Sequence, residues 1–339
     1  MTEAVDRPLR VALIGCGFQG ALHARCATAS SSSVLVTCCD EDRDRAADLA
    51  RSVEVDRFDS DADSVMSDPG VDAVIIATTT GSHADLAVAA ARAGKHVLLE
   101  KPMATTVADC RRIEAAVTSA GVRMMIGFKF RFAPAVLAAR EAVPSPVVVT
   151  AHTLYDAAQT TAGWLGDRAA SGGRLTSSLV HAVDLLRFVT ASEPVRVFAE
   201  GGVLAIEGID EPDNAVATLR FANGTIGSIV HGSAGRSSLV STWSFQLAGV
   251  GSNATVHDHG RRTRFHRAGQ APDRDEYIDP VTDPFAVGMA PMLEAFVTGV
   301  RTGVDPSPGP SDGTVSLAVC REIEAAIETG ETRTISLPD

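Results

Sequence analysis

A glycine-rich turn between a short apolar run and a helical segment constrains this sequence more than any other feature. It reads Gly15-Cys16-Gly17-Phe18-Gln19-Gly20 and directly follows the aliphatic residues 11–14. The first glycine permits a tight turn, the second lets backbone approach a pyrophosphate, and the third lets strand and helix pack closely. The start of the following helix adds partial positive charge. The turn therefore predicts a dinucleotide site contacted by all of its residues except Cys16.

A carboxylate follows the second apolar run, residues 34–39, and lies twenty residues beyond the last glycine of the turn. This carboxylate, Asp40, is placed to accept hydrogen bonds from the ribose diol of the adenosine. Its charge would repel the 2′-phosphate of NADP, so the sequence favours NAD. Arg43 and Arg45 are close enough in sequence to offset that charge, and a simple turn residue is the alternative role for Asp40.

The N-terminal part of the chain alternates short apolar runs with Ala- and Leu-rich segments. This alternation is typical of an α/β Rossmann-type doubly wound parallel sheet covered by helices on both faces. The expected strands are residues 11–14, 34–39, 71–77, 96–99 and 122–126, and the expected helices are residues 20–29, 44–51, 83–93 and 105–120.

The rhythm changes after Arg131, where prolines interrupt the chain and the strands begin to alternate apolar and polar residues. Such alternation predicts a C-terminal α+β domain with a mostly antiparallel, open-faced sheet. We therefore expect a dinucleotide-binding domain over residues 1–130 and a substrate-binding and oligomerisation domain over residues 131–339. Expected strands are residues 147–154, 195–201, 214–221, 225–231 and 242–247, and expected helices are residues 176–189, 284–302 and 312–329.

Polar side chains follow two of the expected parallel strands. Thr78, Thr79 and His83 come after residues 71–77, and Glu100 and Lys101 come after residues 96–99. Ligands of an open parallel sheet bind beyond the carboxyl ends of its strands, so these residues are expected to contact the cofactor. A solvated ion pair for Glu100 and Lys101 and a core or capping role for His83 are the alternatives.

Composition limits the other classes of function. The 339 residues carry a net charge of −12 without a Lys/Arg-rich block, which argues against a nucleic-acid partner. Neither a signal peptide nor a membrane-spanning apolar stretch is visible, so a cytoplasmic protein without a membrane partner is expected. The six cysteines include no CxxC, and no metal site is expected.

The chain resembles the glucose-fructose oxidoreductase, inositol dehydrogenase and rhizopine-catabolism (Gfo/Idh/MocA) family. The resemblance runs from about residue 9 to the end. The motifs that carry it are the glycine turn with His23 three residues on, Thr78 to His83, Glu100-Lys101-Pro102, Gly127 to Phe132, Trp164, Gly172-Gly173, His181 with Asp184, and Asp213-Asn214.

The resemblance implies the chemical roles of two residues. Alcohol oxidation needs a proton acceptor and a positive group for the developing alkoxide. His181 would exchange the proton, and Lys101 would bind the reacting oxygen and lower its pKa. The residues expected to contact the substrate are Lys101, Lys129, Tyr155, Trp164, Thr176, Ser177 and His181.

The sequence departs from the family at Ser177. Members that act on inositol usually carry Asp at this position, four residues before the histidine, and serine cannot hold the negative charge that favours imidazolium. Either Asp184 takes over the orientation of the histidine, or Lys101 and His181 suffice.

These features predict an NAD-dependent oxidoreductase acting on a secondary alcohol or ketone of a sugar, cyclitol or amino-sugar-containing metabolite. A non-catalytic NAD(H)-binding regulator and an NAD-dependent glycosidase are the alternatives. Because an open-faced sheet exposes one side, a homodimer or homotetramer is also expected.

Overall fold

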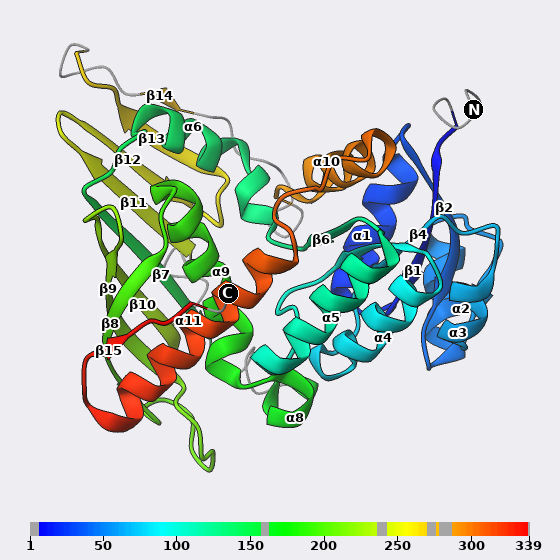
Figure 1. The fold of residues 1–339 in the computed structure, drawn as a ribbon, viewed down its shortest axis with the longest axis horizontal. Helices are drawn as coiled ribbons and strands as arrows, with labels where there is room; N and C mark the ends of the chain where they lie inside the picture. The colour runs from blue at the N-terminus through cyan, green and yellow to red at the C-terminus, as the bar shows by residue number, and fades with distance from the viewer. Residues whose placement is uncertain (1–6, 157–162, 236–242, 270–275, 278–286, 338–339) are drawn as a thin grey trace. The chain divides into compact units, whose positions relative to one another are not determined.

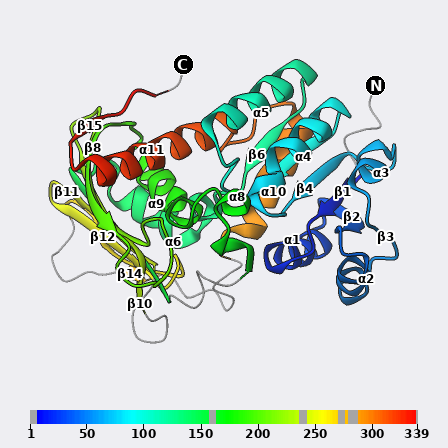
Figure 2. The same ribbon diagram turned by 90° about the horizontal axis from the view of Figure 1, so that it is seen from below.

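The computed structural model describes residues 7–156, 163–235, 243–269, 276–277 and 287–337. The chain divides into two compact units, here called unit 1 (Met1–Phe128 and Met289–Thr314) and unit 2 (Lys129–Gly288 and Val315–Asp339). Figures 1 and 2 show the elements of both. Within the described part of the chain, no helix is long and apolar enough to cross a bilayer.

Unit 1 is built on a parallel sheet of six described strands in the order β3-β2-β1-β4-β5-β6. The strand order reverses between β1 and β4, which makes their carboxyl ends the expected ligand position. The strands are β1 (Leu9–Ile14), β2 (Ser33–Cys39), β3 (Phe58–Asp59), β4 (Ala73–Ile76), β5 (His96–Leu99) and β6 (Met124–Ile126).

Helices cover both faces of this sheet, because right-handed crossovers on either side of the reversal place their helices on opposite faces. They are α1 (Phe18–Ala29), α2 (Arg43–Ser52), α3 (Ala62–Ser67), α4 (Thr80–Arg92), α5 (Val107–Ala120) and α10 (Met289–Thr302). The boundary expected at residue 130 leaves α10 in the second domain, yet α10 packs against α1 and buries Met292 and Phe296.

Unit 2 contains a mixed sheet in which β7 and β10 are parallel and the other pairs are antiparallel. Among the described residues its order is β14-β13-β12-β11-β7-β10-β9-β8-β15. The strands are β7 (Val148–Asp156), β8 (Pro194–Gly202), β9 (Asn214–Phe221), β10 (Ile226–Gly235), β11 (Trp243–Gly249), β12 (Ser252–His257), β13 (Arg262–His266), β14 (Glu276–Tyr277) and β15 (Arg333–Thr334).

One face of this sheet packs against helices, and the other carries exposed apolar side chains. Helix α9 contacts β7 and β10, and α6 contacts β12 and β13. The helical elements of unit 2 are η1 (Lys129–Phe132), α6 (Pro134–Ala142), η2 (Gly163–Gly166), α8 (Arg168–Ser171) and α9 (Arg174–Thr190). Helix α11 (Pro310–Thr329) begins in unit 1 and continues into unit 2.

The structure confirms the predicted fold class in both halves: a doubly wound parallel sheet followed by a mostly antiparallel sheet with helices. The sequence did not predict α3, α6, α8 or the β12–β13 hairpin, which are short or interrupted by turn residues. Residues 284–286 of one expected helix and residue 242 of one expected strand lie outside the described residues.

A buried ion pair joins η1 to α9 in unit 2. Arg131 donates to both carboxylate oxygens of Asp184, at 2.9 and 2.5 Å, and both side chains are more than 90% buried. The planar guanidinium matches a carboxylate in this two-bond geometry, so each charge compensates the other out of water. Arg187 adds a weaker contact to Asp184 at 3.8 Å.

We expect Asp184→Asn to lower the free energy of unfolding by about 3–5 kcal/mol, because it leaves the buried Arg131 without its counter-charge. Urea denaturation followed by circular dichroism measures the change. Asp48→Asn is the control, because Asp48 and its partner Arg51 are more than 70% exposed. If the two variants lower the free energy of unfolding by the same amount, the buried pair does not stabilise the protein more than the exposed pair does.

Candidate functional site

Two helices of unit 1 begin without side-chain caps at the point where the strand order reverses. Among the described residues, no side chain caps α1 at Gly17 or α4 at Thr79. Helices α2, α3 and α5, in contrast, are capped by Asp42, Asp61 and Thr106. Because α1 and α4 follow the adjacent strands β1 and β4, their N-terminal ends lie where an anion would be bound.

Two buried oxygens near these helix starts support the same interpretation. Gln19 Oε1 and Thr80 Oγ1 have no hydrogen-bond partner within the part of the chain that the structure describes. A buried polar atom without a partner costs free energy, so such atoms are usually satisfied by a ligand or by water. Both therefore fit a polar ligand at this edge of the sheet.

The glycines of the turn differ in what their surroundings require. A Cβ at Gly20 would lie 1.9 Å from the Gly15 carbonyl oxygen, and a Cβ at Gly15 would lie 2.6 Å from the Ala77 carbonyl. These two positions exclude side chains through backbone contacts inside unit 1. A Cβ at Gly17 would meet no atom of the described residues within 4 Å. Contacts within the described protein therefore do not explain the glycine at position 17. Close approach of a ligand to the backbone would explain it.

Asp40 directly follows β2 and is 7% exposed. Its Oδ2 accepts a hydrogen bond from Cys16 N at 2.8 Å, and its Oδ1 accepts from Asp42 N and from Arg45 Nη1, both at 3.0 Å. The carboxylate therefore holds the glycine turn in place. Its position at the end of β2 suits ribose recognition, but Arg45 already occupies Oδ1.

The buried Glu100 and the half-buried Lys101 follow β5. Glu100 Oε1 lies 2.8 Å from His23 Nε2, and Oε2 accepts from the Lys101 backbone N–H at 3.2 Å. Burial lowers the pKa of the Lys101 ammonium from its usual value, and the Glu100 charge opposes this by favouring the protonated form. Glu100 is thus part of the interior of unit 1, Lys101 is half-buried, and the two do not form a fully solvated surface pair.

His83 joins the loops that follow β4 and β5. Its Nδ1 lies 2.8 Å from the Pro102 carbonyl oxygen, and its Nε2 lies 3.2 Å from the Thr78 carbonyl oxygen. Burial lowers the pKa of His83, although both contacts favour its protonation. Because the ring is 1% exposed and lies between these two carbonyls, it connects the backbone at Thr78 with the backbone at Pro102, next to Lys101.

In unit 2, His181 on α9 lies in an aromatic cluster. Its ring is edge-on to Phe130 and Trp243, with centroids 5.2 and 5.3 Å away. Phe130 stacks on Trp243 at 4.8 Å, and Tyr155 contacts Trp243 edge-on at 5.8 Å. Burial raises the pKa of the Tyr155 phenol, which therefore stays neutral. Lys129 is also buried, with Nζ 5.7 Å from the Phe130 centroid.

The polar residues before His181 are engaged inside unit 2. Ser177 Oγ donates to the Arg174 carbonyl oxygen at 2.9 Å, and Thr176 Oγ1 donates to Glu324 at 2.6 Å. Asp184 is neutralised by Arg131 as described above. Of the two ways to compensate for Ser177, orientation by Asp184 is therefore the weaker, because that charge is already paired.

The structure brings together some of the expected substrate residues and separates another. Lys129, Tyr155 and His181 share the aromatic cluster, whereas Trp164 is 41% exposed on η2. The sequence analysis did not select Phe130 or Trp243. The alternation of buried and exposed residues in β11, with Trp243 two positions before the buried Phe245, is the signal that marks Trp243 as inward-facing.

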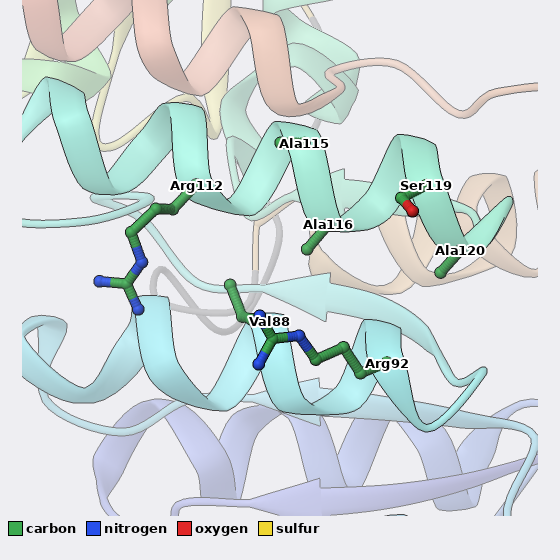
Figure 3. A pocket seen from close by; sticks show the side chains of 7 residues that line it. All are labelled: Val88, Arg92, Arg112, Ala115, Ala116, Ser119 and Ala120. Atoms are coloured by element: carbon green, nitrogen blue, oxygen red, sulfur yellow. The ribbon is translucent and has the colours of Figure 1, made fainter.

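A groove of about 560 Å³ runs along α4 and α5, on residues distinct from those described so far. Figure 3 shows its small side chains flanked by Arg92 and Arg112. Arg112 is engaged with Asp85 and Asp109. The groove contains no group suited to hydride or proton transfer, and we assign it no role in the chemistry. Its lining residues are Val88, Arg92, Arg112, Ala115, Ala116, Ser119 and Ala120.

The doubly wound sheet, the uncapped helix starts at its reversal and Asp40 define a dinucleotide-binding protein. Residues 9–128 match the family described as "Oxidoreductase family, NAD-binding Rossmann fold", and residues 137–249 match the "GFO/IDH/MocA C-terminal domain". Together these matches span more than half of the chain. The chain belongs to the Gfo/Idh/MocA family of oxidoreductases, which confirms the resemblance found in the sequence.

Individual relatives agree with this assignment. The myo-inositol 2-dehydrogenase of Thermotoga maritima is 27% identical over 98% of this chain and 99% of its own length. The inositol 2-dehydrogenase of Acidothermus cellulolyticus is 33% identical over 66% of each chain. A levoglucosan dehydrogenase solved in complex with NADH has the same fold, with a TM-score of 0.86 and 24% identity over 98% of this chain and 100% of its own.

We expect Gly17→Ala and Gly20→Ala to fail in different ways. Gly17→Ala should keep the melting temperature and weaken NADH binding roughly tenfold, because its methyl group enters the space left for the pyrophosphate. Gly20→Ala should lower the melting temperature, because its methyl group meets the Gly15 carbonyl. Thermal unfolding and NADH titration separate the two effects. If Gly17→Ala binds NADH with normal affinity, the pyrophosphate does not occupy the space beside Gly17.

Proposed function

We propose that this protein is an NAD-dependent dehydrogenase that transfers a hydride between nicotinamide and a secondary alcohol or ketone of a sugar or cyclitol. The observation that carries the proposal is the half-buried Lys101, held through its backbone N–H by the buried Glu100, in the same unit as two uncapped helix starts. Anion-binding helix starts suit the cofactor, and a cation of limited hydration suits a developing alkoxide.

The geometry of unit 1 supports a proposed set of cofactor contacts. The glycine turn from Gly15 to Gly20 would hold the pyrophosphate, and Asp40 would accept from the adenosine ribose. The loops carrying Thr78, Thr79 and Glu100 would flank the nicotinamide half, with His83 holding them in place. When bound, NAD supplies the hydride acceptor that no side chain can provide.

Two side chains carry the proposed proton chemistry, with roles that come from the family resemblance. Lys101 Nζ would donate a hydrogen bond to the substrate oxygen and stabilise negative charge on it. The imidazole of His181 would accept the hydroxyl proton during oxidation and return it during reduction. Lys129, Tyr155, Thr176 and Ser177 are the proposed substrate contacts, and Trp164 is a more distant candidate on its exposed helix.

The relatives named above act, by their names, on inositols and on levoglucosan. These compounds are rings with several secondary hydroxyls. We therefore propose the same chemical class for this chain, with an amino-sugar-containing metabolite as a narrower possibility within it. The aromatic cluster around His181 supports a ring-shaped substrate, since aromatic side chains pack against the C–H faces of such rings.

The open face of the unit 2 sheet supports a homodimer or homotetramer. Val148, Phe198, Val216 and Ile226 lie on β7 to β10 and are 37–50% exposed. Burial of this face against a second copy would remove their apolar surface from water. A cytoplasmic location and the absence of nucleic-acid and membrane partners remain predictions from the sequence.

We expect Lys101→Ala to lower turnover about 10² to 10⁴-fold and to leave NADH affinity nearly unchanged, because the ammonium acts on the substrate oxygen. Absorbance of NADH, measured with a panel of cyclitols, sugars and amino sugars, gives turnover. Arg92→Ala on the exposed surface of α4 is the control. Tight NADH binding without turnover of any compound would favour the regulatory alternative, and cleavage of a glycoside would favour the glycosidase alternative.

The pH dependence should change in Glu100→Gln. Lys101 must be protonated to stabilise an alkoxide, so activity falls as pH rises through its pKa. Glu100 raises that pKa, and its replacement therefore lowers it. We expect the alkaline limb of kcat/KM to move to lower pH, with Asp85→Asn as an exposed control. An unchanged or upward-shifted limb would rule out this electrostatic role.

A further inference from the structure

The carboxylate expected to bind the adenosine ribose is already partly neutralised by an arginine. Arg45 Nη1 lies 3.0 Å from Asp40 Oδ1, and Arg45 Nη2 lies 3.2 Å from Asp42 Oδ2. Asp40 is buried, whereas the Arg45 side chain is 50% exposed. The arginine can therefore leave or share the carboxylate by side-chain rotation, while Asp40 is held by the backbone N–H of Cys16.

The structure distinguishes the two arginines that the sequence left equivalent. Arg43 places its guanidinium 5.1 Å from the Phe58 ring centroid, next to Asp59 of β3. Arg45 alone of the two forms an ion pair with Asp40. Its backbone is fixed in the first turn of α2, where its N–H donates to the capping carboxylate of Asp42.

An arginine at this place changes the expected discrimination between dinucleotides. An unpaired carboxylate repels a 2′-phosphate, but a carboxylate paired with arginine carries little net charge toward a ligand. The guanidinium also offers several donors in a planar fork, which matches the oxygens of a phosphate monoester. The same side chain thus removes a repulsion and supplies an attraction.

We propose that Arg45 is a specificity-determining residue, which allows this site to bind a 2′-phosphorylated dinucleotide in addition to NAD. In the NAD complex, Arg45 stays near Asp40 while the ribose diol shares the carboxylate. In the NADP complex, Nη1 keeps its contact with Asp40, and Nη2 turns from Asp42 to the 2′-phosphate. The inference rests on the proposed function in one respect: it assumes that the dinucleotide binds at the carboxyl ends of the unit 1 strands.

The test is equilibrium binding of NADH and of NADPH by isothermal titration calorimetry, without substrate. In the unaltered protein, we expect NADPH to bind within roughly tenfold of NADH. Arg45→Ala should weaken NADPH about tenfold to a hundredfold, as expected for loss of a charged hydrogen bond, with NADH affinity nearly unchanged. Arg43→Ala and Arg51→Ala, on the same helix, should keep the ratio of the two dissociation constants.

The outcomes separate this inference from the proposed function. An unchanged ratio in Arg45→Ala, or binding of NADH without binding of NADPH in the unaltered protein, overturns the role of Arg45 and leaves the dehydrogenase proposal intact. Failure to bind either dinucleotide overturns both. If Arg43→Ala raises the ratio of the NADPH to the NADH dissociation constant and Arg45→Ala does not, Arg43 is the specificity-determining residue. That result also overturns the proposal.

Discussion

The close approach of α1 to the end of β1 is the constraint on which the organisation of unit 1 depends. The Gly15 carbonyl occupies the space where any side chain at Gly20 would begin. Because this contact holds the turn, Cys16 N can donate to Asp40 and Gly15 can lie against Ala77. The ends of β1, β2 and β4 are thus connected through backbone atoms, and the ligand edge of the sheet requires few side chains to define it.

Polar contacts organise the loop after β5. Glu100 accepts from the Lys101 backbone N–H and lies against His23, and its charge opposes the lowering of the Lys101 pKa that burial causes. His83 then fixes the adjoining backbone. A cation can therefore be held at a partly buried position without free movement of its loop.

Local motifs explain why much of unit 1 was predictable from the sequence. The glycine turn and the placement of Glu100 after β5 depend on residues close together in the chain, and the repeated strand and helix pattern gives the sheet. Contacts between distant segments were not visible in this way. The pair of Arg131 and Asp184, 53 residues apart, and the packing of α10 on α1 are products of tertiary structure.

The same reasoning applies to the aromatic cluster. Trp243 and Phe130 reach His181 from a strand and from a short 3-10 helix that are far from α9 in sequence. No spacing rule links them to His181, and the sequence led to Trp164, not Trp243, as the expected substrate contact. Exposure on η2 separates the two tryptophans only after the chain has folded.

Helix α9 shows how the substitution at Ser177 is consistent with catalysis. The helix is buried along most of its length, so its polar side chains must find partners within the protein. Ser177 binds the Arg174 carbonyl, and the charge of Asp184 is used by Arg131. Asp184 is thus already committed to Arg131, and Ser177 to the backbone of its own helix. This arrangement supports the proposal in which Lys101 and His181 suffice for the proton chemistry.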